Sequence, residues 1–530
     1  MLVGSVALQG KLKKKLQQHK KTKFAKIIDS LSSIKKLAGQ TVWYGASTIL
    51  ARFLIYLLTP YLTLKFRGTT AYAEMSLVFA AIPFLNTLFI FGFETAYFRY
   101  IIKNEQKQDV YDTLTSSILA STTFLTLLIL VFYKGIASFI GIGEHPEYIL
   151  LSVFIIAFDT ISALPFAKLR HEGRPRKFAF IRIGGVLINI AIVYFFLSVC
   201  PALLKKYPNS VFLLLYNKDF GVGYILIATL AQAAFQLIMV SGQLIRFKWR
   251  LNFPLWKEMV VYALPLAIAA FAGIVNETFD RIMLRWWAPG TANQALIDVG
   301  IYSACYKLSI LISLFIQAFR MGAEPFFFKQ STEENAPRTY ARVMKFFVIT
   351  ITVMFLVVAL YIDIWKGFIQ DKKMWEGLKV VPILLFANMF LGIYINLSIW
   401  YRLSHKTSPG AYITIIGAVI TLVINYIFVP HFSYMACAWA TFACYGCMMV
   451  ISYVWGQKVY RIPYAWKKLM AYLVIVALLY FIHHIAIRYW QNQWFDYTLA
   501  TILLGSYSLF ILKIERKEFQ KLPYIGKYVR

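Results

Sequence analysis

The chain has 530 residues, of which 59% are hydrophobic and only 15% are charged. A soluble core of this size cannot bury so much apolar surface, so the composition excludes an ordinary globular protein and favours a membrane protein. The formal net charge of +31 could suggest nucleic-acid binding, but the sequence holds no nucleic-acid-binding motif.

The first 40 residues are rich in lysine and include no apolar run like that of a signal peptide. Between Phe24 and Ile34, apolar residues recur at helical spacing among lysines. This pattern predicts a basic amphipathic helix that lies on the inner leaflet, in contact with anionic lipid. Docking to a partner protein is the alternative.

Fourteen apolar stretches follow, each close to the roughly 20 residues with which a helix crosses about 30 Å of hydrocarbon. Lipid offers the backbone no hydrogen-bond partners, and runs without two-residue alternation exclude a closed barrel, so the stretches are expected to be helices. The predicted spans are 42–64, 72–98, 112–133, 148–167, 178–199, 222–245, 262–287, 300–326, 343–364, 378–401, 410–429, 433–456, 466–487 and 495–512. The predicted fold is therefore an all-α polytopic membrane protein.

Lysine and arginine are unevenly divided among the connecting segments. Every second segment is rich in these residues, and these richer segments are the loops at 99–111, 168–182, 246–257, 329–345, 402–406 and 458–468. They hold 23 lysines and arginines and the two tails hold 16, whereas the seven other segments hold 12. Loops rich in lysine and arginine stay on the cytoplasmic side of a membrane. Both tails are therefore expected in the cytoplasm, and the net charge is explained by a surface that faces anionic lipid.

Three short motifs recur in the second half of the chain in the same order. Arg52 stands eight residues before Pro60, as Arg281 stands eight residues before Pro289. The other two pairs are GFETAYFR at 92–99 with GAEPFFFK at 322–329, and KLRHEGRP at 168–175 with RLSHKTSP at 402–409. The offset grows slowly from 229 to 234 residues, which indicates an internal duplication.

The duplication predicts two lobes of six helices each, at 41–246 and 259–457, followed by a helix pair at 463–513 and a basic cytoplasmic tail at 514–530. Because each copy has an even number of helices, the copies are parallel repeats related by an axis along the membrane normal. Such lobes enclose a central cavity. Rocking one lobe against the other exposes that cavity to each side of the membrane in turn.

Once the basic residues of the connecting segments and tails are counted, four remain within the predicted spans, which are Arg52, Arg281, Lys307 and Arg320. A charge that faces lipid is costly, so each is expected to face protein or water. Arg52 and Arg281 occupy matching positions and would flank the central cavity, where two guanidinium groups suit an anionic ligand such as phosphate or pyrophosphate. Alternatively, each arginine forms a structural pair within its own half. Arg281 has Glu277 and Asp280 within one turn.

Asn276, Glu277 and Asp280 form a polar cluster that is unusual for a membrane helix. A carboxylate there could bind Na⁺ or take a proton during transport, and Asp159 and Lys307 could complete the same network. A satisfied salt bridge is the simpler alternative. We expect no other cofactor and no metal centre.

Glu94 and Glu324 repeat at the cytoplasmic ends of the second and eighth spans, close to Arg99 and Lys329. Their repetition predicts either a gate that closes the inner side between the lobes or a pair of helix-end contacts. The two alternatives remain open from the sequence.

The remaining cysteines and histidines carry weaker signals. The CxxC at 444–447 lies in an apolar span without a second pair, so packing is favoured over redox or metal chemistry. His171 and His405 each lie near a proline that separates two helices, which favours a turn. No role follows from the sequence for the two histidines at 483–484.

With these features the chain resembles the polysaccharide transporter family, the Wzx-type flippases of the multidrug/oligosaccharidyl-lipid/polysaccharide exporter superfamily. The resemblance extends from about 38 to 515 and rests on YGASTILARFLIYLLTP with its Arg52, GFETAYFRY, the pair Asp280–Arg281 and the Gly-Ile-Tyr that begins at Gly300. It implies two six-helix lobes plus two further helices. It also implies that a polyprenyl-pyrophosphate-linked oligosaccharide, such as an O-antigen, capsule or exopolysaccharide repeat unit, is flipped across the bacterial inner membrane.

Three alternatives remain. A lipid II flippase of the same superfamily would share the architecture, whereas a multidrug cation antiporter would rely on acidic rather than basic cavity residues. A polysaccharide polymerase or ligase would need catalytic groups in large outer loops, but the longest such loop, at 200–221, holds a single acid, Asp219. We therefore expect a monomeric transporter rather than an enzyme. Contacts with polysaccharide-assembly proteins are left open.

Overall fold

The computed structural model describes residues 43–520, apart from gaps at 69, 104–106, 209–215, 246, 332, 404–407 and 491. The amphipathic segment predicted at 1–40 lies outside the described residues, and so does His405.

Fourteen helices of the described chain are long and apolar enough to cross a membrane, which confirms the all-α polytopic fold. The first helix is Trp43–Lys65, and its last part is α2 (Thr59–Lys65). The N-terminal half continues with α3 (Ala71–Ile90), α4 (Phe93–Lys103), α5 (Lys107–Ile140), α6 (Glu147–His171), α7 (Pro175–Tyr194), η1 (Phe195–Val199), α8 (Cys200–Lys206), η2 (Lys218–Phe220) and α10 (Gly223–Leu244).

The second half begins with the two longest helices. Its elements are α11 (Phe253–Trp287), α12 (Ala292–Gln330), α13 (Ala336–Ala359), α14 (Ile362–Trp365), η3 (Lys366–Phe368), η4 (Lys372–Val380), α15 (Val381–Leu397), α16 (Ile399–Leu403), α17 (Ser408–Phe432), α18 (Tyr434–Val459), α19 (Trp466–Tyr489), α20 (Gln493–Ile514) and α21 (Arg516–Phe519).

The second predicted span is interrupted between α3 and α4. Phe91 and Gly92 have positive φ angles of 50° and 73°, which end the first helix before the next begins. A Cβ added at Gly92 would also lie 3.1 Å from the carbonyl oxygen of Ala263, so only glycine fits both the turn and the close approach of α11.

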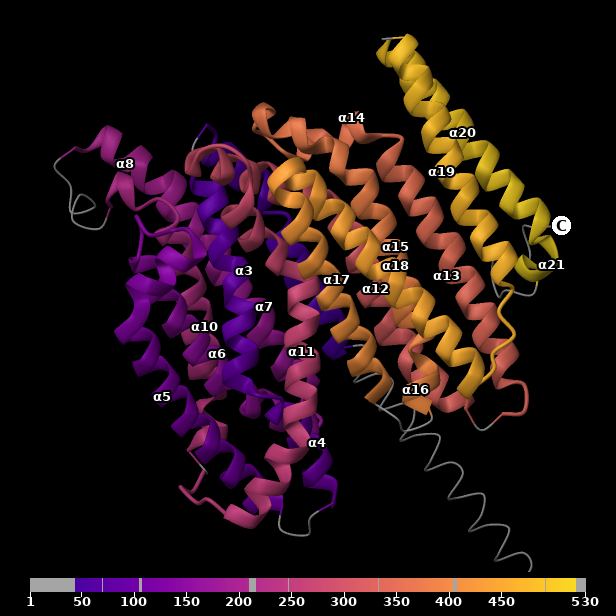
Figure 1. Cartoon of the computed structure of the whole chain (residues 1–530). Coiled ribbons are helices and arrows are strands. Elements are labelled where there is room, and N and C mark those ends of the chain that lie inside the picture. The colour runs from indigo at the N-terminus through magenta and orange to yellow at the C-terminus, as the bar shows by residue number, and fades with distance from the viewer. Residues whose placement is uncertain are drawn as a thin grey trace, which may run out of the picture.

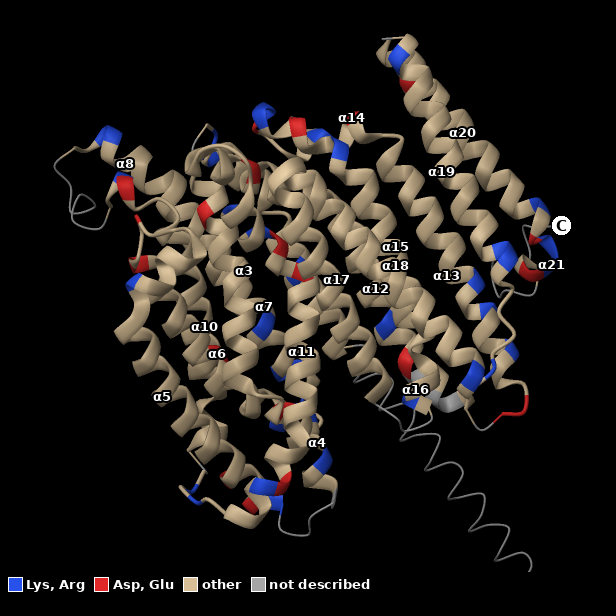
Figure 2. Cartoon of the chain, in the orientation of Figure 1, with Lys and Arg blue, Asp and Glu red and all other residues tan. Residues whose placement is uncertain are grey.

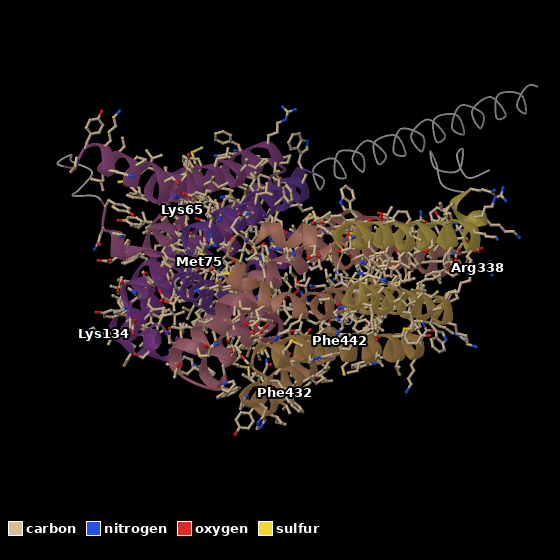
Figure 3. All side chains as sticks on the ribbon, turned by 90° about the horizontal axis from the view of Figure 1, so that it is seen from above. Lys65, Met75, Lys134, Arg338, Phe432 and Phe442 are labelled. Atoms are coloured by element: carbon tan, nitrogen blue, oxygen red, sulfur yellow. The ribbon has the colours of Figure 1, made fainter. Side chains whose placement is uncertain are left out.

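The two halves form two lobes that lie side by side (Figure 1). The N-terminal lobe contains α3, α5, α6, α7 and α10, and the C-terminal lobe contains α12, α13, α15, α17 and α18. Figure 3 shows the same division from above, with the last two helices on the side away from the N-terminal lobe.

Helix α11 contributes to the cores of both lobes. Near its start, Met259 and Ala263 pack with Tyr97 and other buried residues of the N-terminal lobe, and the indole nitrogen of Trp256 donates to Ser117 at 2.9 Å. Further along, Ala272 and Val275 pack against α17. The helix therefore connects the lobes physically as well as in sequence.

The charged residues gather mainly towards the two ends of the helices (Figure 2). We call the end that holds the lysine- and arginine-rich segments the basic end, and the other the opposite end. The first described helix starts at the basic end, where the Tyr44 hydroxyl donates to the carbonyl oxygen of Leu169 at 3.4 Å. The last described residues lie there too, because Glu515 accepts a hydrogen bond from Lys345 at 2.7 Å.

The helices α19 and α20 form a hairpin that packs against α13. At the basic end, Glu515 also accepts hydrogen bonds from Tyr472 at 2.7 Å and Lys468 at 3.0 Å. Nearer the opposite end, His483 and Asp496 form a buried pair at 2.7 Å between the two helices. This contact gives His483 a structural role that the sequence did not indicate.

Candidate functional site

A cavity of about 350 Å³ lies between the lobes, and we call it the central cavity. Its walls come from the first helix, α3, α7 and α10 on one side and from α11 and α12 on the other. Three charged residues line it, namely Glu277, Arg281 and Lys307. Met75, labelled in Figure 3, is part of its apolar wall on α3.

Arg281 lines the central cavity and is also held by its own helix. Its Nη1 lies 3.2 Å from Oδ1 of Asp280 and donates to the backbone oxygen of Glu277 at 3.1 Å. The guanidinium carbon lies 4.5 Å from the ring centre of Tyr306. The structural pair expected as an alternative is thus present, and it is formed with Asp280. Although Arg281 pairs with Asp280, its side chain still lines the central cavity.

Asp280 is itself fixed from a second helix. The hydroxyl of Tyr302 on α12 donates to Oδ2 of Asp280 at 2.6 Å, and the Asp280 side chain is almost fully buried. Because Tyr302 orients the carboxylate and the carboxylate orients Arg281, this triad places a guanidinium group at the wall in a defined position.

Lys307 projects from α12 into the same cavity. Within the described part of the chain its ammonium group forms no ion pair or hydrogen bond. Glu277 also lines the cavity without an ion pair to a described residue. The central cavity therefore contains one cation with a carboxylate partner, Arg281, and one without, Lys307.

A second cavity, of about 390 Å³, lies within the N-terminal lobe and adjoins the first. We call it the N-lobe cavity, and its wall shares Ile55 and Gln232 with the central cavity. Arg52 lines it, so Arg52 and Arg281 face two adjoining cavities rather than one. Nη1 of Arg52 donates to Oε1 of Gln317 on α12 at 2.6 Å. Arg52 therefore bridges the lobes through a neutral partner.

Two further arginines of the N-lobe cavity, Arg170 and Arg182, were assigned from the sequence to a loop. Arg182 donates to Oε1 of Gln236 at 3.1 Å and lies 4.3 Å above the ring of Phe166. Because α7 begins at Pro175, Arg182 sits two turns inside a membrane helix. The predicted span at 178–199 already included Arg182, so the overlap of that span with the loop was the signal in the sequence that could have identified Arg182 as a membrane residue.

Asp159 lies on the wall of the N-lobe cavity, near enough to Arg182 for their charges to interact. It is therefore separate from the cluster around Asn276, with which the sequence suggested a shared network. Asn276 is buried in the C-terminal lobe, where it donates to the backbone oxygen of Thr414 at 3.2 Å and accepts from Thr421 at 3.4 Å. These contacts fasten α11 to α17. Among the described residues, no group of acids, histidines and cysteines could hold a metal ion.

Glu94 and Glu324 each form an ion pair with an arginine of the repeated motif that follows at the basic end of the same lobe. Glu94 pairs with Arg170 on α6, and Glu324 pairs with Arg402 on α16. Each pair lies within one lobe, so neither crosses the interface in this structure. The two glutamates are duplicated positions, but their partners are not, because Arg402 corresponds to Lys168 and Arg170 corresponds to Ser404 in the repeated motif.

The remaining predicted site residues lie near the basic end. Arg320 is 4.0 Å from Glu324 and lines a small cavity beside it, away from the central cavity. The guanidinium carbon of Arg99 lies 4.2 Å from the ring centre of Tyr262 on α11. The side chain of Lys329 lies outside the described residues.

At the opposite end, Arg285 of α11 donates to the backbone oxygen of Gly141 at 3.1 Å, and further contacts join the described segments at 56–68 and 368–371. The backbone nitrogen of Gln370 donates to Thr63 at 3.1 Å, and that of Gly68 donates to Oδ2 of Asp371 at 3.0 Å. The rings of Tyr56 and Phe368 stack with centres 4.6 Å apart. These contacts hold the lobes together between the central cavity and the opposite end.

Two family models match the chain. Residues 37–331 match the family described as polysaccharide biosynthesis protein, and residues 292–427 match the family described as MatE. No curated protein matches the chain at a significant level.

Solved structures share the fold at low sequence identity. A lipid II flippase MurJ in an inward closed conformation has a TM-score of 0.67 and 13% identity, over 89% of this chain and 99% of that chain. A multidrug resistance MATE family transporter in an outward-facing conformation has a TM-score of 0.55 and 14% identity, over 82% and 96%. A MATE transporter from Vibrio cholerae has a TM-score of 0.56 and 13% identity, over 82% and 98%.

Proposed function

The chain belongs to the family of polysaccharide biosynthesis proteins, and from that membership we propose that it flips a polyprenyl-pyrophosphate-linked oligosaccharide across the bacterial inner membrane. Its fold is that of the flippases and transporters of the multidrug/oligosaccharidyl-lipid/polysaccharide exporter superfamily. In this proposal the basic end faces the cytoplasm, as lysine- and arginine-rich loops do.

The observation that carries the proposal is the pair of adjoining cavities with basic walls. Arg52 and Lys307 have no carboxylate partner among the described residues, although both lie within membrane-spanning helices. An uncompensated charge at membrane depth is costly unless it serves a ligand or a water-filled space. A pyrophosphate group supplies the missing negative charge and accepts several hydrogen bonds from arginine and lysine.

The same charges argue against a cation as the main substrate. A cation antiporter needs carboxylates that stay free to meet the drug, whereas Glu94 and Asp280 are engaged by arginines. Glu277 lines the central cavity without such a partner. We assign to Glu277 the uptake of a proton or Na⁺ that couples transport to an ion gradient.

The proposed path follows from the difference between the two ends. The lobe-bridging contacts of Gln370 and Gly68 close the central cavity towards the opposite end, so the headgroup enters from the cytoplasmic leaflet. The polyprenyl chain remains in lipid, because exposing its apolar surface to water would be unfavourable. Separation of these contacts, with closure at the basic end, then releases the headgroup to the periplasmic leaflet. One chain supplies both lobes, so a monomer suffices.

The test uses the purified full-length chain in proteoliposomes with three probes. These are an undecaprenyl-pyrophosphate-linked oligosaccharide, lipid II and the cationic dye ethidium. Transfer of the first probe supports the proposal. Transfer of lipid II alone would identify a lipid II flippase, transfer of ethidium alone would favour the antiporter, and failure to move any probe would refute the proposed function.

A further inference from the structure

A third cavity, of about 500 Å³, opens at the opposite end between the lobes. We call it the end cavity. The segment that joins α2 to α3 lines one side, and the start of α12 together with η4 lines the other. Its polar groups are the hydroxyl of Thr70, the amides of Asn293 and Gln294, and the charged groups of Asp371, Lys373 and Glu376.

The end cavity lies in series with the central cavity. Both are lined by α3 and α12, but the end cavity touches Ala73 and Gly300, whereas the central cavity touches Ser303 and Tyr306, about one turn deeper on α12. Between them the two helices pack closely, because a Cβ added at Gly300 would lie 3.5 Å from the Cβ of Ala73. A headgroup that leaves the central cavity at this end therefore meets the end cavity next.

The chemistry of the end cavity differs from that of the other two. Its described wall holds two carboxylates and one ammonium group, without the excess of positive charge that would attract pyrophosphate. Amides and carboxylates both suit hydroxyl groups, which donate and accept hydrogen bonds. Ile297 and Ile301 add an apolar surface on one side. A few polar groups beside an apolar wall are the usual arrangement of a small-molecule site of this size.

The amide of Asn293 is available to a ligand. It forms no hydrogen bond within the described part of the chain, and its side chain is exposed at the cavity. Asp371, by contrast, is almost fully buried, and its two carboxylate oxygens accept from the backbone nitrogens of Gly68 and Lys373 at 3.0 and 3.1 Å. The Asp371 carboxylate is thus held by backbone groups of both lobes.

We propose that the end cavity is a subsite for the neutral sugar residues of the lipid-linked glycan, and that Asn293 donates to their hydroxyls. This inference rests on the proposed function. Because Asn293 meets only the sugar, its hydrogen bond assists a headgroup that carries a glycan and not a pyrophosphate without sugar.

The test compares two probes in proteoliposomes that contain the full-length chain. One is undecaprenyl pyrophosphate that carries a single N-acetylglucosamine, and the other is undecaprenyl pyrophosphate without sugar. An impermeant pyrophosphatase samples the probe that has reached the outer leaflet. Asn293→Ala is expected to slow transfer of the sugar-bearing probe about fivefold, as expected for the loss of one hydrogen bond, and to leave the sugar-free probe unchanged.

Gln493→Ala is the matched control, because this amide lies at the same end of the molecule but outside the end cavity. An equal effect of Asn293→Ala on the two probes, or no effect on either, would overturn the subsite while leaving the proposed function intact. If the native chain moves neither probe, the proposed function fails and the subsite fails with it.

Discussion

The guanidinium group of Arg52 on the first helix donates to the side-chain oxygen of Gln317 on α12 at 2.6 Å, and this bond joins the two lobes. Arg52 thus has two roles that can be separated by mutation. As a cation it belongs to the proposed anion site, and as a donor it connects the lobes.

Arg52→Ala is expected to lower the rate of glycolipid flipping by at least tenfold, because a charge-assisted contact with pyrophosphate is lost. Gln317→Ala removes the bond between the lobes but keeps the charge, so its rate is expected to stay within about threefold of the native rate. Flipping rates in proteoliposomes distinguish the two variants. An equal loss in both would assign Arg52 to the interface alone.

Lys307→Gln is expected to raise the substrate concentration needed for half-maximal transfer about tenfold, because the central cavity loses its unpaired cation. Lys307→Arg is expected to restore most of the affinity. Lys134→Gln serves as control, since this lysine on α5 lines none of the three cavities. An unchanged half-saturation value in Lys307→Gln would show that the lysine does not meet the headgroup.

The ion pair Glu94–Arg170 predicts the outcome of a double-mutant cycle in the N-terminal lobe. Glu94→Arg and Arg170→Glu are each expected to lower the melting temperature by placing like charges together. The double variant, which restores opposite charges, is expected to recover most of that loss. Melting temperatures in detergent test this, and additive losses in the double variant would contradict the pairing.

Glu515 predicts a pH dependence for the docking of the C-terminal hairpin. Burial raises the pKa of Glu515, but hydrogen bonds from Lys345, Tyr472 and Lys468 lower it more, so the pKa in the fold lies below the usual value of 4.5. The contribution to stability is therefore complete above 4.5 and is lost as the pH falls through the lowered pKa.

Thermal unfolding of the native chain and of Glu515→Gln between pH 7 and pH 3 measures this contribution. The native chain is expected to be the more stable at neutral pH, and the difference is expected to shrink below about pH 4.5. A difference that does not vary with pH would contradict the assignment.

The contact between Thr63 and Gln370 predicts that a covalent bond there stops transport. We expect the double variant Thr63→Cys/Gln370→Cys to form a disulfide on oxidation, because the backbone nitrogen of Gln370 lies 3.1 Å from the Thr63 hydroxyl. Flipping is expected to stop on oxidation and to return on reduction. Continued flipping with the disulfide intact would show that the lobes need not separate here.

Features that depend on the local sequence were largely predictable. The fourteen spans follow from apolar runs, and the duplication follows from matched motifs such as those around Glu94 and Glu324. Arg281 was identified as a cavity residue because a charged side chain in a membrane helix is costly unless it faces protein or water. Even the alternative role of Arg281, a pair with Asp280, could be deduced from their adjacency.

The remaining features depend on tertiary contacts or on exact helix ends. Arg182 was counted with the loop at 168–182, which overlaps the span predicted at 178–199, and the structure places it on α7 because that helix begins at Pro175. The hydrogen bond from Arg52 to Gln317 joins residues that are 265 positions apart in the sequence. A periodic pattern along the sequence does not indicate a contact over such a separation. The pair of His483 with Asp496 likewise appears only when α19 and α20 fold against each other.

The most direct test of the central claim is the distribution of lipid-linked oligosaccharide between the two leaflets of cells that contain the native chain, Arg52→Ala or Lys307→Ala at equal protein levels. A basic cavity that carries the pyrophosphate predicts that the oligosaccharide accumulates on the cytoplasmic face in both variants and not in the native cells. A native distribution in both variants would contradict the claim that these two cations carry the headgroup.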